Sequence, residues 1–226
     1  MNQRFRLLTS SFLLCCASAA HPQVPSQSHK DHFRWSERLA HELDYQHTIA
    51  TAKELTPEER AALFGFILNR FQHPVSSHDA EMFEDLSEKE LRKLASDTRI
   101  EFFDLKGDGK NEIIAQGNGF GACGGTGNCI VLVLQSTSTG FQIVLDSREG
   151  KFGSGYEKIR VLDSSTNGFR DIVLATHDSA SDRTLEVFRF RDGRYRRSDC
   201  FTSTVWSPDH PEGLEQPEIS HGCGEN

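Results

Sequence analysis

The sequence contains no apolar run long enough to cross a bilayer. Leu7–Cys16 is the best candidate, and it falls far short of the ~20 residues that a membrane-spanning helix needs. Positive charge is also scarce, because 25 Lys and Arg residues stand against 33 Asp and Glu residues and leave a formal net charge of −8. This balance argues against non-specific binding to nucleic acid and against adhesion to an anionic membrane. We therefore expect no transmembrane segment and no nucleic-acid partner.

Complete catalytic motifs are missing as well. His41-Glu42 begins the zinc-protease pattern H-E-x-x-H, but Tyr45 stands where the second histidine ligand is needed. The stretch 152–155, FGSG, lacks the first glycine of a nucleophile elbow. These absences favour a non-catalytic protein, although catalytic residues are usually scattered along a sequence.

The first twenty residues have the composition of a secretory signal peptide. Arg4 and Arg6 precede the apolar segment, and Ala17-Ser18-Ala19 supplies an A-x-A cleavage site. We expect cleavage near Ala19 or Ala20 and a periplasmic or secreted mature protein.

Four cysteines follow this leader: Cys123, Cys129, Cys200 and Cys223. An even number of cysteines in an exported chain predicts disulfides, and four cysteines allow three pairings. The pairing Cys123–Cys129 with Cys200–Cys223 is favoured because each pair is local in sequence. A zinc site is not favoured, since neither pair has C-x-x-C spacing.

Changes in composition divide the chain into five segments. They are a signal peptide (1–20), a flexible tail (21–30), a helical region (31–98), a β domain (99–206) and a C-terminal tail (207–226) tied back by the second disulfide. Asp31–Lys53 has apolar residues at helical spacing, and Thr56 and Ser87 each begin a capping box, which predicts three helices. From Arg99 the apolar period changes to two, which indicates β-strands.

The β domain contains an internal repeat. A shift of 59 residues places Ile100 on Ile159, Asp104 on Asp163, Gly109 on Gly168 and Glu112 on Asp171 without a gap. Two copies of a four-strand unit account for the domain, and two copies are too few to close a propeller. We predict an α+β fold in which N-terminal helices pack on a mainly antiparallel β domain made of two similar four-strand units.

The stretch Asp104–Glu112 has the pattern D-x-x-G-D-G-x-x-E between two short apolar strands, and it resembles the FG-GAP/VCBS family of β repeats. The mature chain also resembles uncharacterised exported bacterial proteins that combine such a loop with a C-x-x-T-G-N-C segment, here Cys123–Cys129. The second resemblance implies no known activity.

The FG-GAP/VCBS resemblance implies that the acidic loops bind calcium. The implied ligands are Asp104, Asp108 and Glu112 in the first copy and Asp163, Ser165, Asn167 and Asp171 in the second. Lys106 occupies a ligand position, where its ammonium group would repel the ion. Calcium is therefore the one cofactor that the resemblance suggests. The alternative is a structural turn in which Asp104 and Asp163 accept backbone N–H groups while Gly109 and Gly168 take positive φ.

A glycine-rich loop precedes the strand at Ile130. Its segment 119–124 matches G-x-G-x-x-G, but a dinucleotide site needs a helix to follow, and here a strand follows. The loop is an elaboration of the first unit only, which suggests either recognition or a purely structural loop pinned by a disulfide.

Four arginines surround a predicted hairpin turn at Asp192-Gly193. A two-residue turn places Arg191 opposite Arg194 and Arg189 opposite Arg196, all on one face. Like charges directly opposite each other are unfavourable, so we expect either acidic partners within the chain or an anion-binding face for an acidic glycan.

Three functions remain open from the sequence. The first is an exported, non-catalytic binding or interaction protein. The second is an inhibitor or immunity-type protein that inserts the Cys123–Cys129 loop into a partner's cleft. The third is a hydrolase of extracellular polysaccharide that uses carboxylates drawn from loops, for which two carboxylates at glycosidase separation in a pocket are required.

Overall fold

The computed structural model describes residues 40–73, 80–81, 83–119, 121–149, 155–204, 209 and 218–222. The expected signal peptide, the expected N-terminal tail, most of the C-terminal tail and Cys223 lie outside these residues. No helix within the described ranges is both long and apolar enough to cross a membrane.

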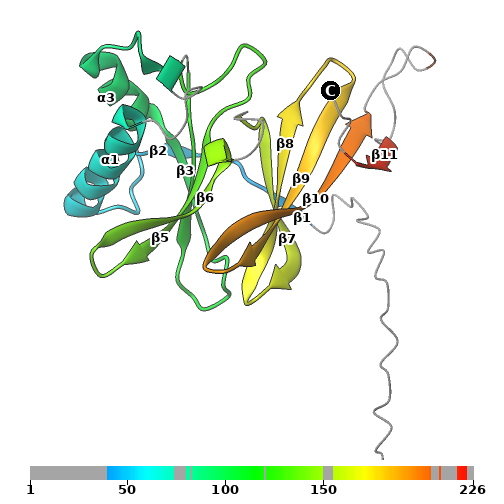
Figure 1. Ribbon diagram of the computed structural model, residues 1–226. Helices are drawn as coiled ribbons and strands as arrows, with labels where there is room; N and C mark the ends of the chain where they lie inside the picture. Colours follow the sequence, from blue (N-terminus) through cyan, green and yellow to red (C-terminus); the bar gives the residue numbers. More distant parts are fainter. Residues whose placement is uncertain are drawn as a thin grey trace, which may run out of the picture. The chain divides into compact units, whose positions relative to one another are not determined.

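Two antiparallel sheets form the β part of the fold (Figure 1). The first sheet has the order β2-β3-β4-β5-β6 and the second has the order β1-β7-β8-β9-β10-β11. The strands of the first sheet are β2 (His47–Thr48), β3 (Arg99–Phe103), β4 (Glu112–Gln116), β5 (Val131–Thr137) and β6 (Gly140–Asp146). Those of the second are β1 (Ala40–Glu42), β7 (Lys158–Thr166), β8 (Phe169–His177), β9 (Asp182–Arg191), β10 (Arg194–Thr204) and β11 (Glu218–His221).

The helices α1 (Pro57–Gln72) and α3 (Glu88–Asp97) begin where the sequence predicts them. The Thr56 side chain accepts the N–H of Glu59, and the Glu59 carboxylate accepts the N–H of Thr56, which closes a capping box. Ser87 and Glu90 repeat this arrangement at α3. A short 3-10 turn, η2 (Ser147–Glu149), follows β6. Helices combined with antiparallel sheets confirm the predicted α+β class.

The first sheet is buried on both of its faces. One face packs against α1 and α3. Its contributing side chains meet Leu63, Ile67 and Leu94 of the helices, and they are Ile100, Ile113, Ala115, Leu132 and Leu134. The other face packs against the second sheet, where Ile114, Val131, Val133 and Val144 meet Ile159, Val161, Ile172 and Leu174. Strand β4 is buried at every position because it has no solvent-facing side.

The prediction of a helix over Asp31–Lys53 is wrong for its described part. Residues 40–42 form β1, which pairs with β7, and residues 47–48 form β2, which pairs with β3. The apolar residues that suggested one helical face enter two different cores, Leu43 between the sheets and Ile49 beneath the helices. The apolar spacing that resembles a helix is therefore produced by a segment that crosses from the second sheet to the first.

The sheets also have more strands than the predicted four-strand units. Strands β3–β6 and β7–β10 each form an antiparallel run in chain order, as expected. The described residues add β2 to the first run, and they add β1 and β11 to the second. These additions come from segments outside the repeat, so the repeat pattern contains no signal for them.

A buried carboxylate connects α1 to the end of β6. Asp146 accepts hydrogen bonds from Arg70 of α1 and from Arg148 of η2, whose Nε and Nη2 atoms lie 3.0 and 3.1 Å from its two oxygens. The side chains of Asp146 and Arg148 are fully buried. Burial works to raise the pKa of Asp146, but the hydrogen bonds and charges of Arg148 and then Arg70 outweigh it and lower that pKa.

We predict that Asp146→Asn lowers the free energy of unfolding at pH 7 by about 3–5 kcal/mol, because it leaves the buried Arg148 guanidinium without this carboxylate. The contribution of Asp146 is present above the ordinary aspartate pKa of about 4 and is lost as the pH falls towards the lower pKa of the folded state. Urea unfolding at pH 7 and pH 3 should therefore show a smaller pH dependence for Asp146→Asn than for the wild type.

The matched control is Asp85→Asn, since Asp85 is exposed. It should unfold like the wild type at both pH values. An Asp146→Asn protein as stable as this control at pH 7 would contradict the assignment.

Candidate recognition site

The first acidic turn is closed by hydrogen bonds of its own. The two oxygens of Asp104 accept the N–H groups of Asp108 at 3.1 Å and Gly109 at 2.8 Å. The Gly109 N–H is the largest cause of a lowered pKa at Asp104. Gly109 has φ 80°, as the structural alternative requires. Glu112 is buried, and it accepts the N–H of Leu105, the residue after Asp104, at 3.0 Å.

The first turn also contacts the second sheet. The N–H of Arg170 donates to the carbonyl of Leu105 at 2.7 Å. Lys106, the departure from the calcium pattern, places its ammonium group 5.0 Å from the centre of the Phe169 ring. This is a cation–π distance, so Lys106 has a role inside the fold.

The second acidic turn differs from the first. Strands β7 and β8 are joined directly by Asn167 and Gly168, with φ values of 52° and 80°. Asp163 pairs with Arg170 at 3.3 Å, so the expected turn in which Asp163 accepts backbone N–H groups does not form.

The remaining oxygen ligands expected in the second copy share no hydrogen-bond partner. Asn167 donates to the carbonyl of Phe190, Asp171 accepts the hydroxyl of Ser164, and Ser165 is exposed on β7. Across the described ranges, no group of three or more His, Cys, Asp or Glu side chains is arranged to hold a metal ion. Calcium binding stays a prediction, and the hydrogen bonds of Asp104 favour a structural turn in the first copy.

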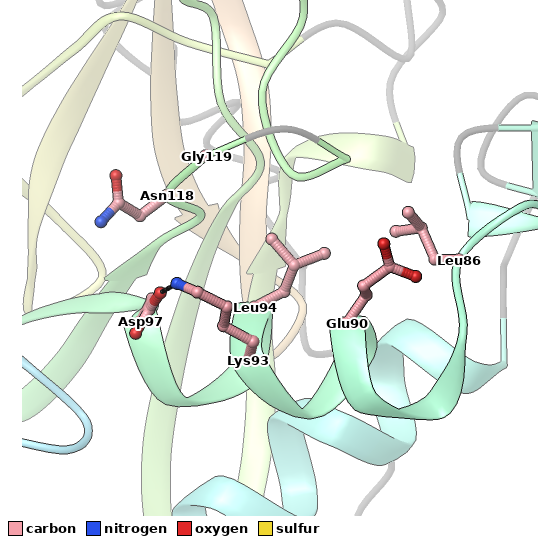
Figure 2. A pocket seen from close by; sticks show the side chains of 7 residues that line it. All are labelled: Leu86, Glu90, Lys93, Leu94, Asp97, Asn118 and Gly119. Atoms are coloured by element: carbon pink, nitrogen blue, oxygen red, sulfur yellow. Dashed lines mark hydrogen bonds and ion pairs between the residues drawn. The ribbon is translucent and has the colours of Figure 1, made fainter.

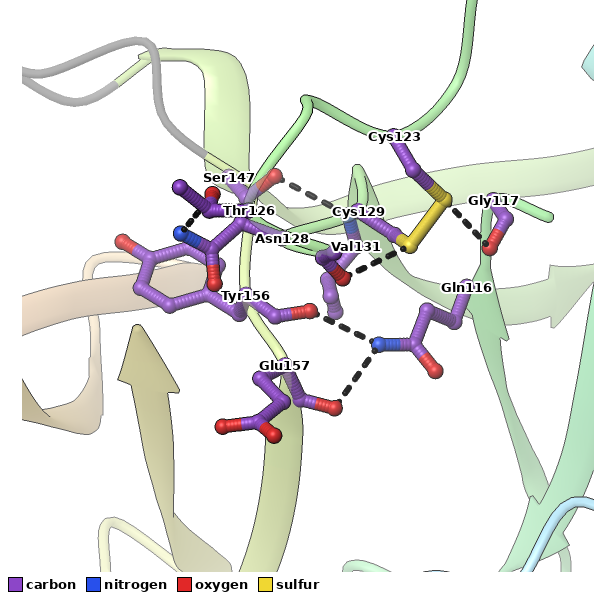
Figure 3. Close-up of a disulfide and its surroundings, with 11 residues drawn as sticks. Gln116, Gly117, Cys123, Thr126, Asn128, Cys129, Val131, Ser147, Tyr156 and Glu157 are labelled. Carbon is purple, nitrogen blue, oxygen red and sulfur yellow. Dashed lines mark hydrogen bonds between the residues drawn. A yellow bond between two sulfur atoms is a disulfide. The ribbon is translucent and has the colours of Figure 1, made fainter. Parts of the chain in front are cut away.

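The predicted disulfide Cys123–Cys129 is present (Figure 3). Cys200 is also disulfide-bonded. Its expected partner, Cys223, lies outside the described residues, so that pairing stays a prediction.

We call residues 117–129 the Gly/Cys loop, of which residue 120 is not described. The loop is attached to the second half of the chain by paired hydrogen bonds. Cys129 and Tyr156 exchange backbone bonds of 3.1 and 2.7 Å, and the Asn128 amide both donates to the carbonyl of His177 and accepts its N–H. The last two residues of the loop are thereby anchored, Asn128 to His177 and Cys129 to Tyr156.

Tyr156 and Gly155 make this attachment possible. The Tyr156 hydroxyl donates to the buried Glu186, and burial followed by the charge of Glu186 raises the pKa of Tyr156. At Gly155 the backbone passes so close that an added Cβ would lie 2.4 Å from the nitrogen of Cys129. Only glycine fits there without displacement of the loop.

The tip of the Gly/Cys loop, residues 124–127, is exposed. Asn128 also donates to the Thr126 hydroxyl at 2.9 Å, which orders the tip from within (Figure 3). A disulfide and anchored ends thus present a four-residue exposed segment.

A pocket of about 410 Å³ lies between the start of this loop and α3 (Figure 2). Its lining consists of Leu86, Glu90, Lys93, Leu94, Asp97, Asn118 and Gly119. Gly121 packs directly on it, since an added Cβ there would lie 2.7 Å from Leu86. The pocket has apolar leucines and a rim of both charges, and the sequence contained no periodic signal that brings these elements together.

The four arginines lie where the hairpin prediction puts them. Arg194 is the register partner of Arg191, and Arg196 is the partner of Arg189. Asp192 and Gly193 both have positive φ, as a type I′ turn requires. The acidic partner expected within the chain exists for Arg189, whose Nε lies 3.8 Å from Asp171.

Comparison of the chain with family models, with curated proteins and with solved structures found no match.

We predict that Gly155→Ala lowers the free energy of unfolding by about 1–3 kcal/mol, because the added methyl group displaces the Cys129 backbone. Gly65→Ala is the matched control, since Gly65 is exposed in α1 and nothing lies within 4 Å of an added Cβ. It should stabilise the protein by about 0.5–1 kcal/mol. If urea unfolding shows that both substitutions change the free energy of unfolding in the same direction, the close approach at Gly155 is refuted.

For the acidic turn we expect no change of melting temperature between EDTA and millimolar calcium, because backbone groups already occupy both oxygens of Asp104. Asp104→Ala should lower the melting temperature in EDTA by a few degrees, since those N–H groups lose their acceptor. A rise with calcium in the wild type that Asp104→Ala abolishes would show that the turn is an ion site.

Proposed function

We propose that this chain is an exported, non-catalytic binding protein that recognises a partner protein with the tip of its Gly/Cys loop. The observation that carries the proposal is the combination of an exposed tip with a fixed base. Residues 124–127 are exposed, while Cys129, Asn128 and the disulfide hold the ends of the loop.

Rigidity matters because ordering a loop on binding costs free energy. A recognition loop that is already ordered in the free protein avoids that cost and so gains affinity. A loop with only a stabilising role would not need an exposed tip ordered by Asn128 and Thr126.

Export is part of the proposal. The signal-peptide pattern of the first twenty residues is one support, and the Cys123–Cys129 disulfide is a second, independent support. Disulfides persist in the periplasm and outside the cell, where thiols are not kept reduced.

We also propose that the β part is a duplicated unit of FG-GAP/VCBS type. The residues paired by the 59-residue shift occupy comparable places: Ile100 and Ile159 are buried in β3 and β7, and Glu112 and Asp171 are buried near the starts of β4 and β8. The duplication explains why each sheet contains a four-strand run in chain order.

An inhibitor or immunity-type role is the more specific form of this function. Such proteins insert a preformed loop into a partner's cleft, and the disulfide-closed tip has that form. Either role, inhibitor or immunity protein, agrees with the proposal, because both require direct contact between the tip and a partner.

The hydrolase alternative has weaker support. The pocket beside α3 contains the carboxylates of Glu90 and Asp97, but Glu90 serves the helix cap and Asp97 pairs with Lys93. Hydrogen bonds from Ser87 lower the pKa of Glu90, whereas the general acid of a glycosidase needs a raised pKa.

The test is site-specific photo-crosslinking in the exporting cell. A benzoylphenylalanine at position 126 should yield one dominant protein adduct, and purified wild-type protein should compete with its formation. The same probe at Lys89, an exposed position on α3, is the control and should not yield this adduct.

Identical adducts from both positions, or no adduct at position 126 in a protein that is exported and folded, would overturn the proposal. Release of reducing sugars from extracellular polysaccharides by the purified chain would establish the hydrolase instead.

A further inference from the structure

The hairpin β9–β10 carries a dense group of arginines on a rigid support. We call Arg189, Arg191, Arg194 and Arg196 the arginine face. They form two adjacent cross-strand pairs, because Arg191 is opposite Arg194 and Arg189 is opposite Arg196. Cross-strand neighbours have Cβ atoms about 5 Å apart, and next-but-one residues along a strand are about 7 Å apart. The four guanidinium groups therefore share a small area.

The other face of the hairpin is held by aromatic contacts. The Phe190 ring stacks on Phe169 with centres 3.7 Å apart, and Tyr195 meets both rings edge to face. The Tyr195 hydroxyl donates to the carbonyl of Arg170 at 2.8 Å, and Asn167 donates to the carbonyl of Phe190 at 2.8 Å. These contacts fix the hairpin against β8, so the arginines project from a preorganised surface.

The charges of the arginine face are only partly balanced within the described residues. Arg189 lies near Asp171, and Arg194 is half-buried and engaged with the chain. Arg191 and Arg196 are exposed, and the described part of the chain supplies no carboxylate within 4.0 Å of either. Their repulsion with Arg194 and Arg189 is unfavourable in the free protein, and a bound anion would relieve it.

We propose that the arginine face binds the anionic groups of an acidic polysaccharide, at a site separate from the Gly/Cys loop. Guanidinium groups form paired, parallel hydrogen bonds with carboxylate and sulfate oxygens, which suits them to such polymers. A cluster of four offers several of these contacts along one polymer chain.

Nucleic acid fits this surface less well. Single strands are bound by stacking bases on aromatic side chains beside basic residues, but Phe188, Phe190 and Tyr195 point to the opposite face of the hairpin. Duplex DNA has one charge per ~1.7 Å of its axis, and the net charge of −8 repels so dense a polyanion. An acidic polysaccharide has more widely spaced charges and can contact the arginine face alone.

The test uses the mature chain from residue 21 and three immobilised probes: polygalacturonate for carboxylates, dextran sulfate for sulfates, and single-stranded DNA. Binding is measured at about 50 mM salt and again at higher salt, since each released counterion adds to the salt dependence. We expect the wild type to bind one or both polysaccharides, with uncharged dextran as the blank.

The decisive variants are Arg191→Ser with Arg196→Ser, which remove the two exposed arginines. We expect at least a tenfold loss of polysaccharide affinity with an unchanged melting temperature. The matched control is Lys89→Ser with Arg92→Ser, which removes the same charge from the exposed surface of α3 and should leave affinity unchanged. Arg191→Lys with Arg196→Lys keeps the charge without the paired geometry and should lose an intermediate amount.

Failure of the wild type to bind either polysaccharide would overturn the proposal, and so would equal losses in the α3 control. Tighter binding to single-stranded DNA than to both polysaccharides would assign the face to nucleic acid instead. The crosslinks from position 126 do not depend on these arginines, so the two proposals succeed or fail separately.

Discussion

The burial of the first sheet on both faces is the constraint on which the rest of the structure depends. A sheet with no solvent-facing side needs a cover on each face, and α1 with α3 supplies one while the second sheet supplies the other. The strands β4 and β5 must then be apolar at consecutive positions, as Ile113, Ile114 and the run from Val131 to Leu134 are. Polar groups that enter this layer need partners, and Asp146, Glu112 and Gln116 each find them.

The same constraint explains why the loop that joins the interior strands β4 and β5 of the first sheet is firmly held. Gln116 ends β4 inside the protein and donates to the carbonyl of Tyr156, which also bonds to Cys129. The Gly/Cys loop begins directly after Gln116 and returns at β5. Both of its ends therefore start from buried strands, and its exposed described residues are Gly119 and residues 124–127.

Local chemistry was predictable from the sequence, and long-range placement was not. Thr56 and Ser87 mark their helices because a capping box is completed within four residues. Asp192-Gly193 marks its turn because both residues tolerate positive φ, and the arginine pairing follows from a two-residue turn. The Cys123–Cys129 pair is likewise local.

The predictions that the structure contradicts mainly concern contacts between segments far apart in the sequence. Leu43 and Ile49 have helical spacing, but each packs into a different hydrophobic core. The strands that form those cores lie far along the chain. The second acidic turn matches the first in sequence, yet Asp163 meets Arg170 and the strand continues. The pocket beside α3 and the exchange between Asn128 and His177 join segments with no shared pattern.

The two short strands before α1 protect the β part against association with itself. Strand β1 pairs with β7, and β2 pairs with β3, so one brief segment occupies an outer position in each sheet. Without it, the N–H and C=O groups of β3 and β7 would be open to a strand of another molecule. Because His41 pairs with Val161, this protection is complete only after synthesis has passed well beyond the midpoint of the chain. A shortened chain that begins at Thr56 would keep both capping boxes but lose Leu43 and Ile49 from the two cores, and it would leave two sheet edges open to association.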